Sequence, residues 1–462
     1  MTFRTLLALS LAALPARAEP LFPYSRETAA RLIGDVLTDP LVFGRLEHLT
    51  DAIGPRLSGG PGHAKAVEWT AAQLRADGVE VRLEKVMVPH WVRGEETGAI
   101  VGSQGRVEQP LFLTALGGSA GTPAEGLEAE VVLVRSVEEA AALGEKARGK
   151  IVFFQGHMTA SKDYGAGSKL RVRGPAAAAG VGAVAALVRS AATASLRSPH
   201  TGVTLFDAGH PIPAAAVSTE DADLLERLIG QGPVRVRLKL GCKTLPDVET
   251  ANVVAELKGR EKPEEIVLLG GHLDSWDLAT GAIDDGAGVA VVMAAIRALS
   301  HLPQHPRRTV RVVLFANEEN GSRGAQGYKA AHASELAHHV AGIEMDAGAG
   351  RAVSISGPNA PALLGPWLGR EGPLAGLGVT DVNDGGHGGA DIGGLAESAQ
   401  VPMVDVDQEG AHYFDLHHSA ADTLDKVDPQ QLRQAAASLA WVTYALAEMQ
   451  GTLDRRAPKP RK

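Results

Sequence analysis

The sequence has a single cysteine, Cys242, among its 462 residues, which excludes a disulfide bond within the chain. A chain of this length buries enough apolar surface to be stable without crosslinks. Cys242 follows Leu240-Gly241, and in this context we expect a small buried residue rather than a nucleophile.

Positive charge is also in short supply, since the formal net charge is −9. Because basic residues do not outnumber acidic ones, the surface is not expected to attract the phosphate backbone of a nucleic acid. A nucleic-acid partner is therefore excluded. The one basic cluster, residues 455–462, contains two prolines. We expect it to be a flexible terminal tail.

No apolar run approaches the ~20 residues that a membrane-spanning helix needs. The run Leu6–Leu14 is short, follows the positive charge of Arg4 and precedes Ala16-Arg17-Ala18, which fits a small-x-small cleavage site. These three regions are typical of a secretory signal peptide. We therefore expect residues 1–18 to be removed and the protein to be exported, either to a periplasm or as a secreted protein.

The length of the chain predicts two or three structural units. Residues 105–243 differ from the rest, because short strand-like runs such as Lys150–Phe154 alternate there with Ala-rich helical pieces such as Pro175–Val188. No dense set of metal-ligating side chains occurs in this region. We interpret it as an inserted domain.

The remaining chain alternates strands with helices, a pattern typical of an α/β fold with a mostly parallel mixed sheet flanked by helices. The expected helices are two stretches within Glu27–Leu49 separated at Pro40, then Ala64–Leu74, Val289–Leu299 and a last helix from Asp428 to Met449. The expected strands are Val79–Val88, Ile266–Leu269, Val310–Phe315, Val340–Met345 and Met403–Val406.

Acidic and imidazole side chains follow three of these strands. The first strand ends at His272-Leu273-Asp274, the second at Glu318-Glu319 and the third at Asp346. In an open parallel sheet the carboxyl ends of the strands form the ligand-binding edge. We therefore expect these side chains to lie close together.

Two further segments add to this set. Asp284-Asp285 stands in the Gly-rich stretch 281–288, and His417-His418 lies shortly before the last helix. Each alone has an ordinary explanation, as a solvated turn or a packed histidine. Together, imidazole and carboxylate ligands favour zinc over calcium or magnesium, which prefer oxygen ligands only.

These segments resemble the motifs of the co-catalytic zinc exopeptidases, a group that includes leucyl-type aminopeptidases, glutamate carboxypeptidase and, most similar here, carboxypeptidase Q. The resemblance rests on 271–275, 281–288, 317–321, 344–346 and 418–423, and it extends over about residues 25–450. It implies a zinc exopeptidase fold and the hydrolysis of terminal peptide bonds in small peptides or dipeptides.

The resemblance also implies a role for each residue. Two zinc ions are expected, held by His272 and Asp346 on one side, by Glu319 and His418 on the other, and by Asp284 as a bridge. Glu318 is expected to be the general base. Asp274 is expected to orient the ring of His272 without binding a metal ion itself. The peptide bond Asp284-Asp285 matches a position where the family has a cis bond. Cobalt or manganese could replace zinc, because supply and geometry decide between them.

His417 precedes the last ligand, at a position where glutamate carboxypeptidase has a tyrosine that donates to the oxyanion. We hypothesise the same role for His417, with a packed histidine as the equal alternative. Gly149–Phe154 resembles the core strand of a protease-associated domain. The expected organisation is thus a peptidase domain formed by 19–104 and 244–454 around an inserted domain at 105–243.

Several alternatives remain open from the sequence. A receptor-like relative without catalysis and a glutaminyl cyclase-like enzyme with one zinc share the fold. Among exopeptidases, an aminopeptidase needs an acidic group for the free amine, whereas a carboxypeptidase needs a basic one, which Arg323 could supply. Relatives often dimerise, so a homodimer is expected by analogy only.

Overall fold

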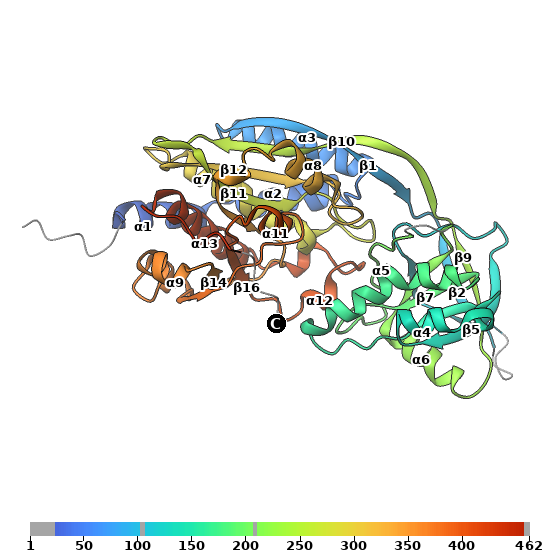
Figure 1. Cartoon of the computed structure of the whole chain (residues 1–462). Coiled ribbons are helices and arrows are strands. Elements are labelled where there is room, and N and C mark those ends of the chain that lie inside the picture. Colours follow the sequence, from blue (N-terminus) through green and yellow to red (C-terminus); the bar gives the residue numbers. More distant parts are fainter. Residues whose placement is uncertain (1–23, 102–106, 207–209, 457–462) are drawn as a thin grey trace, which may run out of the picture.

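The computed structural model describes residues 24–101, 107–206 and 210–456, which form two units joined by a pair of long strands (Figure 1). The predicted signal peptide, residues 1–18, lies outside the described residues. The larger unit is built on a five-stranded sheet. In spatial order its strands are β1 (Glu80–Val92), β10 (Lys243–Leu257), β12 (Arg308–Phe315), β11 (Lys262–His272) and β13 (His339–Glu344).

This sheet is less parallel than the sequence predicts. β12, β11 and β13 are parallel neighbours, whereas β1 pairs with β10 and β10 pairs with β12 in antiparallel fashion. The difference arises because β10 returns from the second unit directly beside β1. Two strands that meet in this way need no crossover helix and pair antiparallel.

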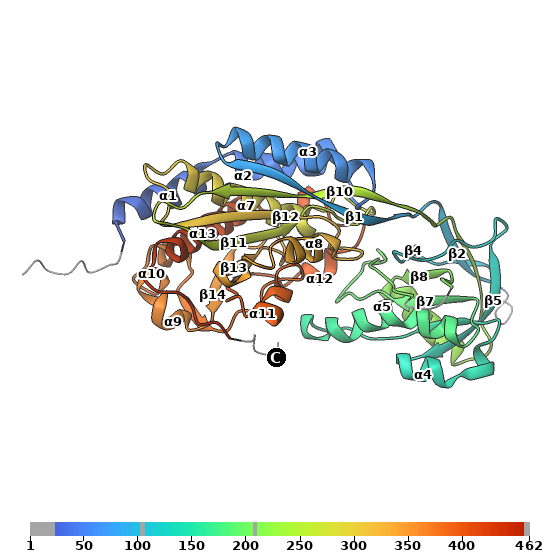
Figure 2. The same ribbon diagram turned by 45° about the horizontal axis from the view of Figure 1, so that its top comes forward.

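Helices cover both faces of the sheet (Figure 2). One face is covered by α1 (Arg26–Thr38), α2 (Leu41–Glu47), α3 (Pro61–Ala76), α7 (Ala287–Ser300) and α13 (Pro429–Glu448). The other face is covered by α8 (Arg323–Ala331) and α11 (Gly393–Ala399). As predicted, Pro40 separates α1 from α2 and Pro429 begins α13.

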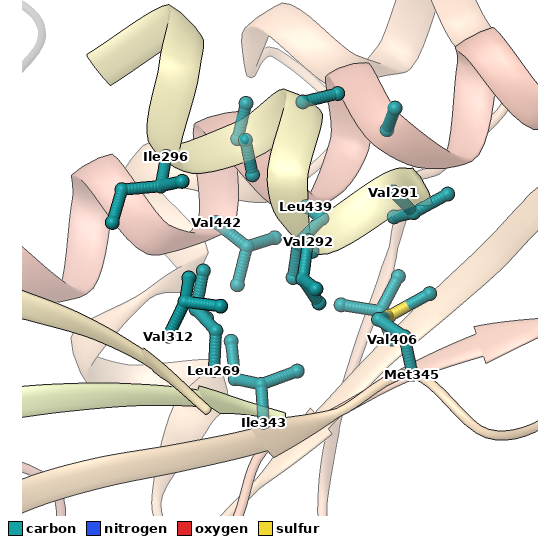
Figure 3. Packing of buried hydrophobic residues seen from close by; sticks show 14 of the residues in the cluster. Leu269, Val291, Val292, Ile296, Val312, Ile343, Met345, Val406, Leu439 and Val442 are labelled. Carbon is teal, nitrogen blue, oxygen red and sulfur yellow. The ribbon is translucent and has the colours of Figure 1, made fainter. Parts of the chain in front are cut away.

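The main core lies between the sheet and helices α7 and α13 (Figure 3). Val292 and Ile296 of α7 lie opposite Leu269 and Val312 of the strands, and all four are buried. Burial of one such side chain contributes about 1.5–3 kcal/mol. This packing fixes the strands whose ends carry the candidate ligands.

A three-stranded sheet is formed by β15 (Asp381–Asp384), β14 (Ala352–Gly357) and β16 (Asp405–Gln408). The prediction that Met403–Val406 is a strand of the main sheet is therefore wrong, because β16 pairs with β14 in this smaller sheet. Only Met403 forms a bridge with the edge strand β13, at Gly342. Pro402 has no N–H to extend this pairing, and the chain continues into the smaller sheet as β16.

The second unit lies between β1 and β10 in the chain, and we call β2 to β9 with their connections the inserted unit. Its eight strands are, in spatial order, β3 (Gln109–Pro110), β2 (Glu96–Val101), β9 (Arg235–Leu240), β5 (Leu127–Val134), β6 (Ile151–Phe154), β7 (Ala185–Arg189), β8 (Ala214–Val217) and β4 (Leu113–Ala115). Its helices are α4 (Val137–Ala142), α5 (Tyr164–Gly180) and α6 (Thr219–Ile229). Because β2 pairs with β9, the unit begins before residue 105.

One element of the inserted unit was predicted incorrectly. The expected helix Pro175–Val188 is the end of α5 followed by strand β7. Gly182, with φ of +80°, turns the chain between them. Ala185–Val188 is fully buried in a parallel part of the sheet, where a continuous run of small apolar residues is compatible with a strand.

The remaining α-helices of the described residues are short, namely α9 (Ala360–Leu363), α10 (Gly365–Leu368) and α12 (Tyr413–Leu416). The first residue of the predicted tail, Arg455, is anchored, because its guanidinium donates to the carbonyl oxygens of Leu336, Ala337, His339 and Ala399. Within the described residues, every helix is too short or too polar to span a bilayer.

Candidate metal centre

The predicted edge of the sheet is where the candidate ligands meet. His272 is the last residue of β11, Glu318 and Glu319 follow β12, and Asp346 follows β13. Since these three strands are parallel neighbours, their carboxyl ends bring the side chains together.

Asp284 lies at the centre of this arrangement. Its Oδ1 is 3.0 Å from Nε2 of His272, and its Oδ2 is 3.3 Å from Nε2 of His418. Asp346 completes one group, with 3.6 Å from its Oδ1 to Nε2 of His272. Glu319 completes the other, with 3.0 Å from its Oε2 to Nε2 of His418. In each group the ligand atoms lie within 4.8 Å of one another.

This donor set fits zinc. Nitrogen and oxygen ligands about 2.0–2.2 Å from a tetrahedral ion lie roughly 3.3–3.5 Å apart, close to the separations found here. Each group offers one imidazole and two carboxylates if Asp284 is counted in both. The five predicted ligands are thus placed as two adjacent groups that share one carboxylate.

The backbone around Asp284 is held by buried carboxylates. The peptide bond Asp284-Asp285 is cis, as predicted. Asp422 accepts hydrogen bonds from the N–H groups of Ile283 and Asp284 at 2.6 and 3.2 Å. Asp285 accepts from the N–H groups of His272 and Gly288 at 3.0 and 3.1 Å. These contacts fix the position of the shared carboxylate relative to the strand that carries His272.

Main-chain carbonyl groups orient both histidine rings. Nδ1 of His272 donates to the carbonyl oxygen of Asp274 at 3.0 Å, and Nδ1 of His418 donates to that of Thr201 at 3.2 Å. With the proton on Nδ1, each Nε2 keeps a lone pair for a metal ion. Thr201 belongs to the inserted unit, so the two units jointly position His418.

Asp274 contacts His272 through its backbone carbonyl group and not through its carboxylate. Its carboxylate is 3.9 Å from Nδ1 of His272, and its Oδ1 instead accepts a hydrogen bond from the N–H of Glu318 at 3.0 Å. Asp274 therefore contacts His272 through its backbone and the candidate base through its side chain.

Glu318 lies beside both groups without belonging to either. Its side chain lines a cavity of about 1220 Å³ that also contacts Asp284, Glu319, Asp346 and His418. Burial raises the pKa of Glu318 well above its usual range, and the carboxylates of Glu319 and Asp346 raise it further. A carboxylate that binds protons readily at this position can exchange one with a reacting molecule.

His417 is buried beside the same cavity. Its ring packs against Tyr164, Tyr413 and Phe414, and neither ring nitrogen has a hydrogen-bond partner within the described chain. Burial lowers the pKa of His417 well below its usual range, so the ring is neutral and carries one N–H. These surroundings are compatible with both the oxyanion and the packing interpretation.

Arg56 is a component that the sequence did not indicate. Its side chain is fully buried, and it donates to the carbonyl oxygens of Leu273, Thr280 and Gly281 at 2.9, 2.6 and 2.9 Å. It thereby holds the loop between His272 and Asp284. Arg56 follows Gly54-Pro55 in a Gly-rich loop, and only its contacts with residues more than 200 positions away reveal its role.

Comparison with known proteins shows which family this chain resembles in sequence. Residues 252–443 match Peptidase family M28. Human carboxypeptidase Q (Homo sapiens) is 38% identical over 420 residues, which cover 89% of this chain and 86% of that protein. Carboxypeptidase Q of Rattus norvegicus is 39% identical over 419 residues, with the same shares covered.

Solved structures agree. The crystal structure of a peptidase M28 precursor from Shewanella amazonensis is similar with a TM-score of 0.86 and 38% identity, covering 94% of this chain and 99% of that one. An aminopeptidase from Aneurinibacillus has a TM-score of 0.66 at 21% identity, covering 94% and 98%, and shows likeness of fold.

The fold, the donor set and these similarities define a metallo-exopeptidase, which is a hydrolase. The chain belongs to Peptidase family M28.

Proposed function

We propose that this chain is an exported exopeptidase that binds two zinc ions and hydrolyses terminal peptide bonds of small peptides or dipeptides. The observation that carries the proposal is the pair of ligand groups sharing Asp284, with Glu318 beside them and outside both. Residues 1–18 would act as the signal peptide, with release to a periplasm or to the medium. The similarity to carboxypeptidase Q supports the reaction type.

His272 and Asp346 would hold one zinc ion, Glu319 and His418 the other, and Asp284 both. When bound, the pair of ions lowers the pKa of a water molecule and polarises the scissile carbonyl group. Glu318 then accepts the proton of the attacking water and delivers it to the leaving amine nitrogen. Asp274 keeps Glu318 in place through the hydrogen bond from its N–H.

His417 would donate its single N–H to the oxygen that gains charge during attack. Its ring lines the cavity and has a free donor, which supports this role. We also propose that the parts of 19–104 and 244–454 that lie outside the inserted unit form the peptidase domain, and that the inserted unit is a domain of the protease-associated type. Its place over the cavity would limit the size of substrates, and a homodimer remains part of the proposal by analogy.

The test is a metal analysis combined with a substrate screen on the mature chain. We expect about two zinc ions per chain, the number that a two-metal site needs, and hydrolysis of unblocked dipeptides. Cyclisation of an N-terminal glutamine peptide with one zinc per chain would support the cyclase alternative. A metal-free, inactive but folded protein would support a receptor-like relative, and either result would overturn the proposal.

A further inference from the structure

Helices α8 and α11 of the larger unit both line the cavity beside the candidate metal centre. Arg323 and Gln326 come from α8, and Glu397 comes from α11. Other lining residues, such as Tyr164 of α5, belong to the inserted unit. The cavity is thus bounded by both units, and the two helices form the part of its wall that belongs to the larger unit alone.

A groove of about 690 Å³ continues from this wall between the same two helices. Gln326 lines both the cavity and the groove, and Ser398 in the groove directly follows Glu397 in the chain. All the residues that line the groove belong to the larger unit. A peptide that extends from the metal centre into the groove therefore does not pass the inserted unit.

One face of α8 leads from the cavity into the groove. Gln326, Lys329 and Ala330 lie three or four positions apart, a spacing that places them on the same side of a helix. An α-helix rises about 1.5 Å per residue, so Arg323 at the cavity and Ala330 in the groove are roughly 10 Å apart. Three extended residues, at about 3.3–3.6 Å each, span this distance.

The groove combines small apolar side chains with positive charge. Ala330 and Ala333 are exposed in it, and its charged lining residues are Lys329 and Arg455. Arg455 donates to main-chain carbonyl oxygens, and Lys329 forms no ion pair with any described residue. Among the described residues, no carboxylate lines the groove. A segment with acidic side chains is therefore complementary to it in charge.

We propose that the groove between α8 and α11 binds the part of a longer peptide that lies beyond the two residues flanking the scissile bond, with a preference for acidic side chains. This inference rests on the proposed function and extends its substrate class from dipeptides to peptides of about five residues. An exposed apolar groove that is continuous with a catalytic cavity is suited to such a segment. Contacts made far from the reacting atoms raise kcat/KM.

The test compares alanyl-leucine with two pentapeptides as substrates for the zinc-loaded full-length enzyme. One extends the dipeptide on its N-terminal side and the other on its C-terminal side, and both carry two aspartates at the end remote from the Ala–Leu bond. We expect one of them to be cleaved at this bond with a kcat/KM at least about 10-fold above that of the dipeptide. Replacing its aspartates by lysines should lower kcat/KM by about 2- to 5-fold, as for an exposed ion pair.

Variants of α8 connect this gain to the groove. Ala330→Trp fills the groove and should bring kcat/KM of the pentapeptide close to that of the dipeptide. Ala331→Trp is the matched control, because Ala331 is exposed on the same helix and lines neither the cavity nor the groove. It should keep the full gain. Lys329→Gln should abolish the preference for aspartate over lysine, and this exposed substitution covers the case in which Ala330→Trp does not fold.

Several results would overturn the inference while leaving the proposed function intact. These are equal kcat/KM for the dipeptide and both pentapeptides, or an equal loss on dipeptide and pentapeptide in Ala330→Trp. A change of oligomeric state in Ala330→Trp with an unchanged length preference would instead identify the groove as a contact between copies of the chain. A protein that cleaves no peptide and binds no zinc would contradict the proposed function itself.

Discussion

Thr201 and His418 are joined by two hydrogen bonds in opposite directions. The N–H of Thr201 donates to the carbonyl oxygen of His418 at 2.8 Å, and Nδ1 of His418 donates to the carbonyl oxygen of Thr201 at 3.2 Å. One residue belongs to the inserted unit and the other is a candidate metal ligand. The inserted unit therefore takes part in building the site as well as covering the cavity.

The contact of Gly117 with Trp276 tests this coupling. A Cβ atom at Gly117 would lie 2.1 Å from the Trp276 ring, and the backbone N–H of Trp276 donates to Oε1 of Glu319 at 3.2 Å. We expect Gly117→Ala to displace Trp276, to weaken zinc binding about 10- to 100-fold and to cost about 1–3 kcal/mol of stability. Chelator competition and urea unfolding would measure both effects.

Gly165→Ala is the matched control, because nothing lies within 4 Å of a Cβ atom at this position of α5. It should leave zinc affinity unchanged and increase stability by up to about 1 kcal/mol. Unchanged zinc affinity in Gly117→Ala would show that the two units are not coupled through Trp276.

The shared position of Asp284 predicts unequal effects of ligand substitutions on metal content. Asp284→Ala should reduce zinc from about two ions per chain to nearly none, whereas His272→Ala should leave about one, because only one group loses a ligand. Elemental analysis after dialysis measures the difference, with the exposed Asp381→Ala as control. Equal zinc content in Asp284→Ala and His272→Ala would contradict a bridging carboxylate.

Arg56 is expected to be essential for stability. Arg56→Met leaves the carbonyl oxygens of Leu273, Thr280 and Gly281 without a donor and removes a buried positive charge near four acidic residues. We expect a loss of about 3–5 kcal/mol in the free energy of unfolding. Arg75→Met, on the exposed side of α3, should change it by less than about 0.5 kcal/mol. Similar values for the two variants would contradict this role.

The particular residues above show what sequence reasoning could reach. His272, Glu318, Glu319 and Asp346 were predictable because buried apolar strands end directly before them. Arg56 and Thr201 were not, because their roles depend on contacts between residues more than 200 positions apart. The sequence of strand β7 predicts a helix because its alanines favour a helix in isolation, whereas burial in the sheet stabilises a strand.

His339 should make stability depend on pH. Its side chain is buried, and burial lowers its pKa from 6.5 to about 4. Between these values the unfolded chain binds a proton that the folded chain does not, so stability falls as the pH decreases from 6.5 to 4. The contribution is roughly 3 kcal/mol at pH 4. Urea unfolding of the metal-free protein should therefore show a smaller loss for His339→Asn.

His338→Asn is the control, because this neighbouring side chain is exposed. It should lose stability toward acid as the parent protein does. An identical pH dependence in His339→Asn and the parent would contradict the assignment to His339.

The most direct test of the proposed mechanism is the turnover of Glu318→Gln. The amide keeps the shape of the side chain but cannot accept the proton of the attacking water. We expect zinc content and thermal stability to match the parent, while kcat falls by about 10²- to 10⁴-fold. The exposed Glu68→Gln on α3 should keep the parental rate. A folded, zinc-loaded Glu318→Gln that hydrolyses dipeptides as fast as the parent would contradict the account.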